Sequence, residues 1–151
     1  MKKILIIYHS QTGNTEKMAR TLSKGAAKIE GIEIIVKKAK DASLYDLHSC
    51  NGLAIGSPEY FGYMAGAIKD FFDRTYNKAK EKTRHLPYVL FVCAGNDGRG
   101  AITQIERIAA GYRWKKVAKP IRAIAPVTQE ILKDLDEMGQ TLAAGVEAGI
   151  F

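Results

Sequence analysis

Short, nearly continuous apolar runs recur along the chain, and between them apolar residues are spaced three or four apart. Continuous apolar runs are typical of strands in a parallel sheet that is covered on both faces. We predict such strands at Lys3–Tyr8, Glu33–Lys37, Gly52–Gly56, Tyr88–Cys93 and Val117–Ala123. Because Pro120 cannot donate a ladder hydrogen bond, we expect the fifth strand at a sheet edge or at a bulge.

The stretches between these runs have the period of amphipathic helices, in which one apolar face packs against a sheet. We predict helices at Thr12–Glu30, Met64–Asn77, Gly100–Tyr112 and Thr128–Ala148. Strands and helices that alternate in this way form a doubly wound α/β domain. The length of 151 residues is typical of one domain, so we predict a single domain over residues 1–151.

The first predicted strand runs directly into a hydroxyl-rich loop, Ser10–Thr15, and then into a helix. Backbone N–H groups at the start of a helix lack internal partners and favour negative charge. Ser10, Thr12 and Thr15 add hydroxyl groups, and Gly13 lets the backbone turn tightly. The loop lacks the Lys of a P-loop and the three glycines of a dinucleotide loop, so it suits a single phosphate. An ordinary strand-to-helix turn capped by Asn or Thr is the alternative.

The first strand and loop resemble the phosphate loop with which the flavodoxin family binds flavin mononucleotide (FMN). The residues that carry the resemblance are Ile6-Ile7-Tyr8-x-Ser10-x-x-Gly13-x-Thr15-x-x-x-Ala19. The resemblance covers the whole chain and every fixed position of that pattern. It implies a flavodoxin-like sheet of five parallel strands in the order 2-1-3-4-5, and FMN as a noncovalent cofactor. The chain differs from the usually acidic family in its net charge of +7.

Two further loops are expected beside the first, because ligands of doubly wound folds bind outside the carboxyl ends of the strands. The second loop, Ser57–Met64, concentrates aromatic side chains that could stack on a planar ring. The third loop, Ala94–Gly100, contains three glycines, which let backbone groups approach the edge of a ring. The alternatives are a core position for Phe61 and a plain solvent-exposed turn for the third loop.

Under this interpretation the first loop holds the phosphate, the second borders the flavin ring, and the third borders its pyrimidine end. The predicted cofactor-binding residues are Ser10, Gln11, Thr12, Gly13, Asn14, Thr15, Ser57, Pro58, Glu59, Tyr60, Phe61, Gly62, Ala94, Gly95, Asn96, Asp97 and Gly98. Negative charge at Glu59 and Asp97 would lie near the ring and lower the potential at which the flavin accepts electrons. No residue is assigned a catalytic role, and the His and Cys spacings predict no metal site.

The resemblance implies an electron carrier that serves redox partner proteins. The second loop also resembles the flavin loop of NAD(P)H:quinone oxidoreductases in the same superfamily, through the arrangement Pro58-x-x-Phe61-Gly62-x-Met64. Those proteins often have Arg at the position of Tyr60 and Asn at the position of Tyr63. An FMN-dependent enzyme that reduces quinones or FMN with NAD(P)H is therefore the main alternative. A remote alternative is a phosphatase, because Cys93 and Arg99 have Cys-x₅-Arg spacing and a helix start can lower a thiol pKa.

Composition is ordinary for a soluble globular protein, with 46% hydrophobic and 26% charged residues. The first apolar run is too short for a signal peptide or a membrane span. We expect a cytoplasmic protein with reduced thiols that acts as a monomer or a weak homodimer. No nucleic-acid motif is present, so no specific nucleic-acid partner is expected.

Basic residues gather in two groups that we expect at the edge opposite the ligand loops. The first group is Arg74, Lys78, Lys80, Lys82 and Arg84, and the second is Arg113, Lys115, Lys116, Lys119 and Arg122. A solvated basic face is the plain interpretation of these groups. Lys37, Lys38 and Lys40 follow the second strand on the ligand edge and would steer an acidic redox partner toward the flavin.

Overall fold

The computed structural model describes all 151 residues, which form one mainly parallel sheet. The strands are β1 (Lys2–Tyr8), β2 (Ile32–Lys38), β3 (Gly52–Tyr60), β4 (Tyr63–Met64), β5 (Pro87–Ala94), β6 (Lys115–Lys116) and β7 (Ile121–Ile124). Their order is β2-β1-β3-β5, with β6 and β7 following one another along the outer edge of β5. Only β4 is antiparallel, as it folds back on β3. The predicted fold class and strand order are confirmed, with β6 and β7 together in fifth place.

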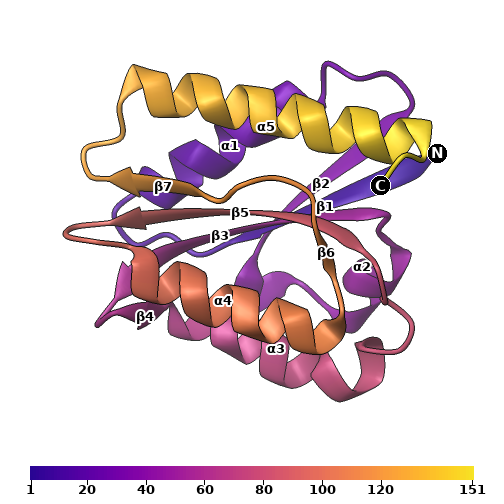
Figure 1. The fold of residues 1–151 in the computed structure, drawn as a ribbon, viewed down its shortest axis with the longest axis horizontal. Coiled ribbons are helices and arrows are strands. Elements are labelled where there is room, and N and C mark those ends of the chain that lie inside the picture. The colour runs from indigo at the N-terminus through magenta and orange to yellow at the C-terminus, as the bar shows by residue number, and fades with distance from the viewer.

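Helices cover both faces of the sheet (Figure 1). They are α1 (Asn14–Ala26), α2 (Leu44–Ser49), α3 (Gly66–Ala79), α4 (Arg99–Tyr112) and α5 (Gln129–Ala148), with a short 3₁₀ turn, η1 (Ala39–Asp41). The helices α1 and α5 lie side by side on one face, and α2, α3 and α4 lie on the other. The carboxyl ends of β5 and β7 point to the left edge of Figure 1. None of the helices combines the length and the apolar character that a membrane span requires.

The sheet separates two apolar cores. In β1, Ile4 and Ile6 face α1 and α5, whereas Leu5 and Ile7 face the opposite helices, as the alternation of a strand requires. The backbones of α1 and α5 are in contact at two glycines, Gly25 in α1 and Gly139 in α5. A Cβ at Gly25 would collide with the Asp136 carbonyl group. This contact fixes α1, which follows the first loop, against the last helix of the chain.

The structure corrects the sequence prediction in four places. In place of the predicted strand Val117–Ala123 there are two short strands, β6 before this range and β7 at its end, because the segment around Pro120 leaves the ladder. The turn η1 and the helix α2 were not predicted, since six residues are too few to show a helical period. The strand β3 continues to Tyr60, well past the predicted Gly56, because its end pairs with β4. The predicted first helix was too long, and α1 ends at Ala26.

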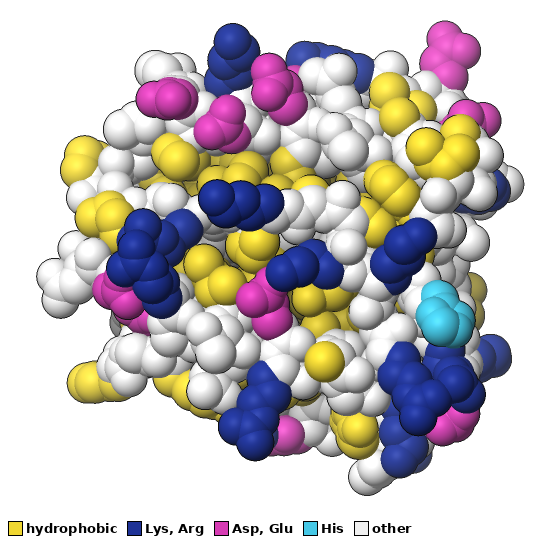
Figure 2. All heavy atoms as spheres, in the orientation of Figure 1, with side chains coloured by type: hydrophobic (Ala, Val, Ile, Leu, Met, Phe, Trp, Pro, Cys, Tyr) yellow, Lys and Arg dark blue, Asp and Glu magenta, His cyan; other side chains and the backbone are white.

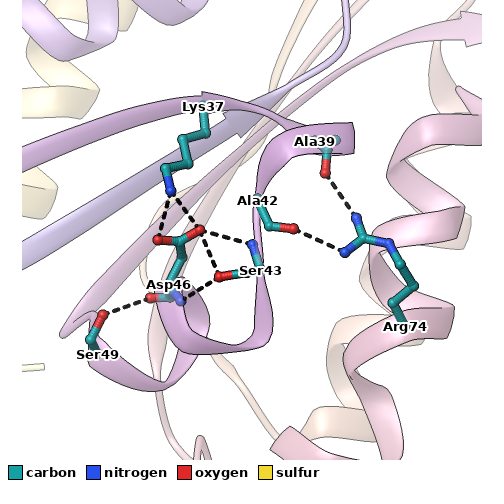
Figure 3. A network of polar contacts seen from close by, with 7 residues as sticks. All are labelled: Lys37, Ala39, Ala42, Ser43, Asp46, Ser49 and Arg74. Atoms are coloured by element: carbon teal, nitrogen blue, oxygen red, sulfur yellow. Dashed lines mark hydrogen bonds and ion pairs between the residues drawn. The ribbon is translucent and has the colours of Figure 1, made fainter.

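A buried carboxylate holds the unpredicted segment in place (Figure 3). Asp46 accepts hydrogen bonds from the Lys37 ammonium at 2.9 Å and from the Ser43 amide at 2.8 Å. Ser43 and Asp46 form a capping box at the start of α2. Burial works to raise the pKa of Asp46, but the bonds from Lys37 and Ser43 hold this pKa below its usual value. Lys37 is therefore half-exposed and paired with Asp46, which offsets the charge that was expected to steer a partner.

Arg74 ties the same segment to α3. Its guanidinium group donates to the carbonyl oxygen atoms of Ala42 at 2.9 Å and Ala39 at 3.0 Å (Figure 3). Ala39 is the first residue of η1 and Ala42 directly follows it, so both carbonyl groups lie where the backbone leaves regular structure and needs donors. One member of the first basic group thus supports the fold.

We expect Asp46→Asn to lower the free energy of unfolding by about 1–3 kcal/mol near neutral pH, because Lys37 and Ser43 lose their acceptor. The native pKa of Asp46 is lowered, so this stabilisation is complete above about pH 4 and is lost as the pH falls through the native pKa. Urea unfolding at neutral and strongly acidic pH measures both effects. Asp73→Asn breaks only an exposed pair with Lys69 and should cost less than about 1 kcal/mol. Equal losses in the two variants would contradict this assignment.

Candidate functional site

The three predicted loops surround one hollow of about 250 Å³ at the carboxyl ends of β1, β3 and β5. This is the edge at which doubly wound folds bind ligands. The residues that line it are Ser10, Gln11, Thr12, Asn14, Thr15, Pro58, Glu59, Tyr60, Cys93, Ala94, Gly95 and Ala125. All but two of them belong to the predicted cofactor-binding set. The hollow therefore brings the first loop together with parts of both other loops.

Cys93 and Ala125 line the hollow without having been predicted as site residues. Cys93 lies near the end of β5, directly before the third loop, and a strand that points at the site could have indicated it. Ala125 follows β7, and its amide donates to the Ala94 carbonyl oxygen at 2.9 Å. Nothing in the sequence near Ala125 indicated this position, because it depends on the pairing of β7 with β5.

The remaining predicted residues lie around the hollow and do not line it. They are Gly13, Ser57, Phe61, Gly62, Asn96, Asp97 and Gly98. Gly13 takes a left-handed conformation with φ 100° at the N-cap of α1, and its amide donates to the Ser10 hydroxyl oxygen at 3.1 Å. Ser57 is fully buried, and its hydroxyl oxygen accepts from the Ala65 amide at 3.0 Å. Both residues therefore fix the backbone of their loops and do not face the hollow.

The second loop is a tight hairpin between β3 and β4. Phe61 and Gly62 form its turn with φ 55° and 71°, the left-handed pair that such hairpins need. The Phe61 side chain is fully exposed, so it is not the core residue that the alternative interpretation assumed, whereas Met64 is buried. Tyr60 lines the hollow and meets the His9 ring edge-on at a centroid distance of 6.0 Å. Tyr60 is thus the aromatic residue of this loop that faces the site.

Asp97 in the third loop is surrounded by positive charge. Its carboxylate lies 2.6 Å from the Arg99 guanidinium group and 3.8 Å from that of Arg122. Arg122 also donates to the Asp97 carbonyl oxygen at 2.6 Å. The two arginines reduce the effect that the Asp97 charge would have on a ligand in the hollow.

The start of α1 has the properties of an anion site. The helices α2 and α5 are capped by the side chains of Ser43 and Thr128, but α1 has no side-chain cap. Its first N–H groups therefore remain for an external acceptor. Thr15 in the first helical turn is buried and lines the hollow. Because no Lys or Arg lines the hollow, helix dipole, backbone and hydroxyl groups would hold an anion there.

The environment of Cys93 opposes the phosphatase alternative. Burial raises the pKa of the Cys93 thiol, whereas a phosphatase nucleophile needs a lowered one. The Arg99 side chain is directed to Asp97. The amide of Gly98 is already bonded to the carboxylate of Glu59 at 2.8 Å, so the third loop offers no free phosphate cradle. The geometry gives a phosphatase no support.

We expect iodoacetamide to modify Cys93 at least about tenfold more slowly than free cysteine at neutral pH, because a raised pKa leaves little thiolate. Peptide mass spectrometry of timed samples measures the rate. Cys50 provides an internal comparison, since burial raises its pKa to about 12 and it should react even more slowly. We also expect no turnover of p-nitrophenyl phosphate. A Cys93 that reacts as fast as free cysteine would contradict the assignment.

Comparison of sequences relates the chain to proteins of known family. A family model described as Flavodoxin matches residues 6–111. A curated flavodoxin from Aquifex aeolicus (strain VF5) is 42% identical over 73 residues, which are 48% of this chain and 40% of that relative. The matched segment therefore spans less than half of the relative.

Comparison of structures extends the likeness to nearly the whole chain. An archaeal flavodoxin superposes with a TM-score of 0.86 at 21% identity, over 96% of this chain and 99% of the other. A WrbA-like flavodoxin from Agrobacterium tumefaciens has a TM-score of 0.82 at 17% identity, over 98% and 99%. A flavodiiron core from Synechocystis sp. PCC6803 has a TM-score of 0.84 at 22% identity, over 98% of this chain and 36% of that one. At these identities the likeness establishes the fold and not the activity.

Proposed function

The chain belongs to the flavodoxin family, whose members bind FMN, and we propose that it is an FMN-binding electron carrier. The observation that carries the proposal is the uncapped start of α1, which opens into the hollow shared by three loops. A singly phosphorylated ligand fits this arrangement because the oxygen atoms of one terminal phosphate can accept hydrogen bonds from the free N–H groups of a single helix. When bound, FMN supplies the electron-transfer chemistry.

Each loop contributes a different kind of contact to the proposed site. Ser10, Thr12 and Thr15 supply hydroxyl groups beside the start of α1, where they would hold the phosphate. Tyr60 supplies an aromatic face for the ring. Gly95 leaves backbone groups accessible at the opposite wall, where they would meet the polar edge of the ring. The remaining predicted residues would support these contacts from outside the hollow.

We expect the purified protein to bind FMN, and the bound flavin to absorb at about 450 nm. Thr15→Val should weaken FMN binding about tenfold, because a hydroxyl contact to the phosphate is lost. Quenching of flavin fluorescence during titration measures the dissociation constant. Thr21→Val is the matched control on the same helix, since the Thr21 hydroxyl is bonded to the Lys17 carbonyl oxygen at 2.9 Å. A wild-type protein that does not bind FMN would overturn the proposal.

The surface charge supports an acidic redox partner. Lys38 is the last residue of β2 and Lys40 follows the strand; both are exposed, and neither takes part in an ion pair. In Figure 2, Lys and Arg side chains are spread over the visible face and are densest at the lower right, near the end of α4. The His85 amide donates to the carbonyl oxygen of Arg113, the C-cap residue of α4, at 2.8 Å, which joins the two basic groups. Within the second group, Arg122 lies beside the third loop.

We expect the reduced flavoprotein to transfer electrons to anionic ferricyanide more slowly as salt is added, because positive charge attracts the acceptor. Cationic hexaammineruthenium should show the opposite trend in stopped-flow measurements. Replacing Lys38 and Lys40 with Gln should reduce the salt effect on ferricyanide more than Lys24→Gln, which removes an exposed charge from the far end of α1. Equal effects in both variants would argue against steering by Lys38 and Lys40.

An FMN-dependent NAD(P)H oxidoreductase is the second candidate, because the hairpin sequence around Phe61 and Gly62 resembles that of quinone reductases. The two functions differ in their electron donor. Stopped-flow mixing of the FMN-loaded protein with NADH or NADPH distinguishes them, and an electron carrier should be reduced only slowly. Rapid reduction followed by turnover with a quinone would favour the enzyme.

A further inference from the structure

The side chain of Glu59 extends from the second loop to the helix that follows the third loop. Its Oε1 atom accepts from the Gly98 amide at 2.8 Å, and its Oε2 atom accepts from the Ala101 amide at 3.0 Å. Gly98 is the N-cap residue of α4 and has no side chain with which to cap the helix. A carboxylate satisfies the free N–H groups at this position and is favoured by the helix dipole. Glu59 therefore caps a helix that starts 40 residues later in the chain.

The turn of the hairpin rests on the same helix end. A Cβ added at Gly100 would collide with the Gly62 carbonyl oxygen and would lie 3.2 Å from Oε2 of Glu59. The hairpin backbone and the first turn of α4 are therefore in direct contact, and only glycine fits at position 100. This contact is independent of charge. It joins the same two segments that the Glu59 carboxylate joins.

We propose that Glu59 is a positioning residue that couples the second and third loops into one unit before the cofactor binds. The third loop is held by β5 at one end and by the Gly98 bond at the other, and the second loop is held by β3 and by Glu59 itself. Walls that are already in place lose less conformational entropy when a ligand binds. This inference rests on the proposed binding of FMN, because it concerns the walls of that site.

The coupling role differs from the sequence expectation that Glu59 acts as a negative charge beside the ring. Both carboxylate oxygen atoms are bonded to amides of α4, and the positive end of that helix offsets their charge. If Glu59 acted only through its charge, Glu59→Asp would behave like the wild type. If Glu59 acts as a bridge, Glu59→Asp fails as well, because a side chain one methylene shorter cannot reach both amides.

The experiment compares Glu59→Gln, Glu59→Asp and a control on the same helix. Gln can accept only one of the two bonds, because its NH₂ group is a donor. We expect both variants to increase the hydrogen-exchange rates of the Gly98 and Ala101 amides about tenfold in FMN-free protein, as followed by NMR. FMN affinity should fall about tenfold in both. Glu106→Gln, which removes an exposed pair with Lys116, should change neither quantity.

Gly100→Ala tests the coupling without a change of charge, since it displaces the Gly62 carbonyl group. We expect the same increase in exchange and the same loss of FMN affinity. Wild-type exchange and affinity in Glu59→Asp would overturn the proposal, and so would a Glu59→Gln protein in which only the flavin midpoint potential changes. Because exchange is measured without FMN, it decides the coupling even if the wild-type protein fails to bind FMN.

Discussion

Backbone N–H groups at the start of a helix need acceptors, and the functional edge of this protein is built around that requirement. The helices α2 and α5 supply their own acceptors through Ser43 and Thr128. The helix α4 receives its acceptor from Glu59 in another loop. The helix α1 has no side-chain cap, and the hollow lies in front of it. The free N–H groups that destabilise an isolated helix would, at α1, favour an anion in the hollow.

The parts of the fold that follow from local patterns were predictable from the sequence. Buried strands such as β5 are apolar runs in the sequence, so the sheet order was inferred correctly. The first loop has hydroxyl residues and a glycine at fixed spacing, and its residues line the hollow beside the other two loops. The parts that depend on contacts between distant segments were not predictable. The exposure of Phe61, the position of Ala125 and the bonds of Glu59 all depend on how separate loops meet.

Charge in this molecule has two distinct uses that the sequence alone does not separate. Some basic residues serve the fold, as Lys37 does with Asp46 and Arg74 does with the carbonyl groups beside η1. Others, such as Lys38 and Lys40, are exposed and unpaired, so their charge is not offset by a neighbouring side chain. A run of lysines in a sequence therefore overstates the charge that an approaching molecule meets locally.

The contact between α1 and α5 has a consequence for folding during synthesis. Gly25 of α1 packs directly on the backbone of α5, so the helix behind the phosphate loop is supported by the last helix of the fold. During synthesis, the loop around Thr15 leaves the ribosome long before the segment that steadies it. A nascent chain therefore carries the complete sequence of the first loop before α5 is present, and the packing that supports α1 is complete only when α5 has docked.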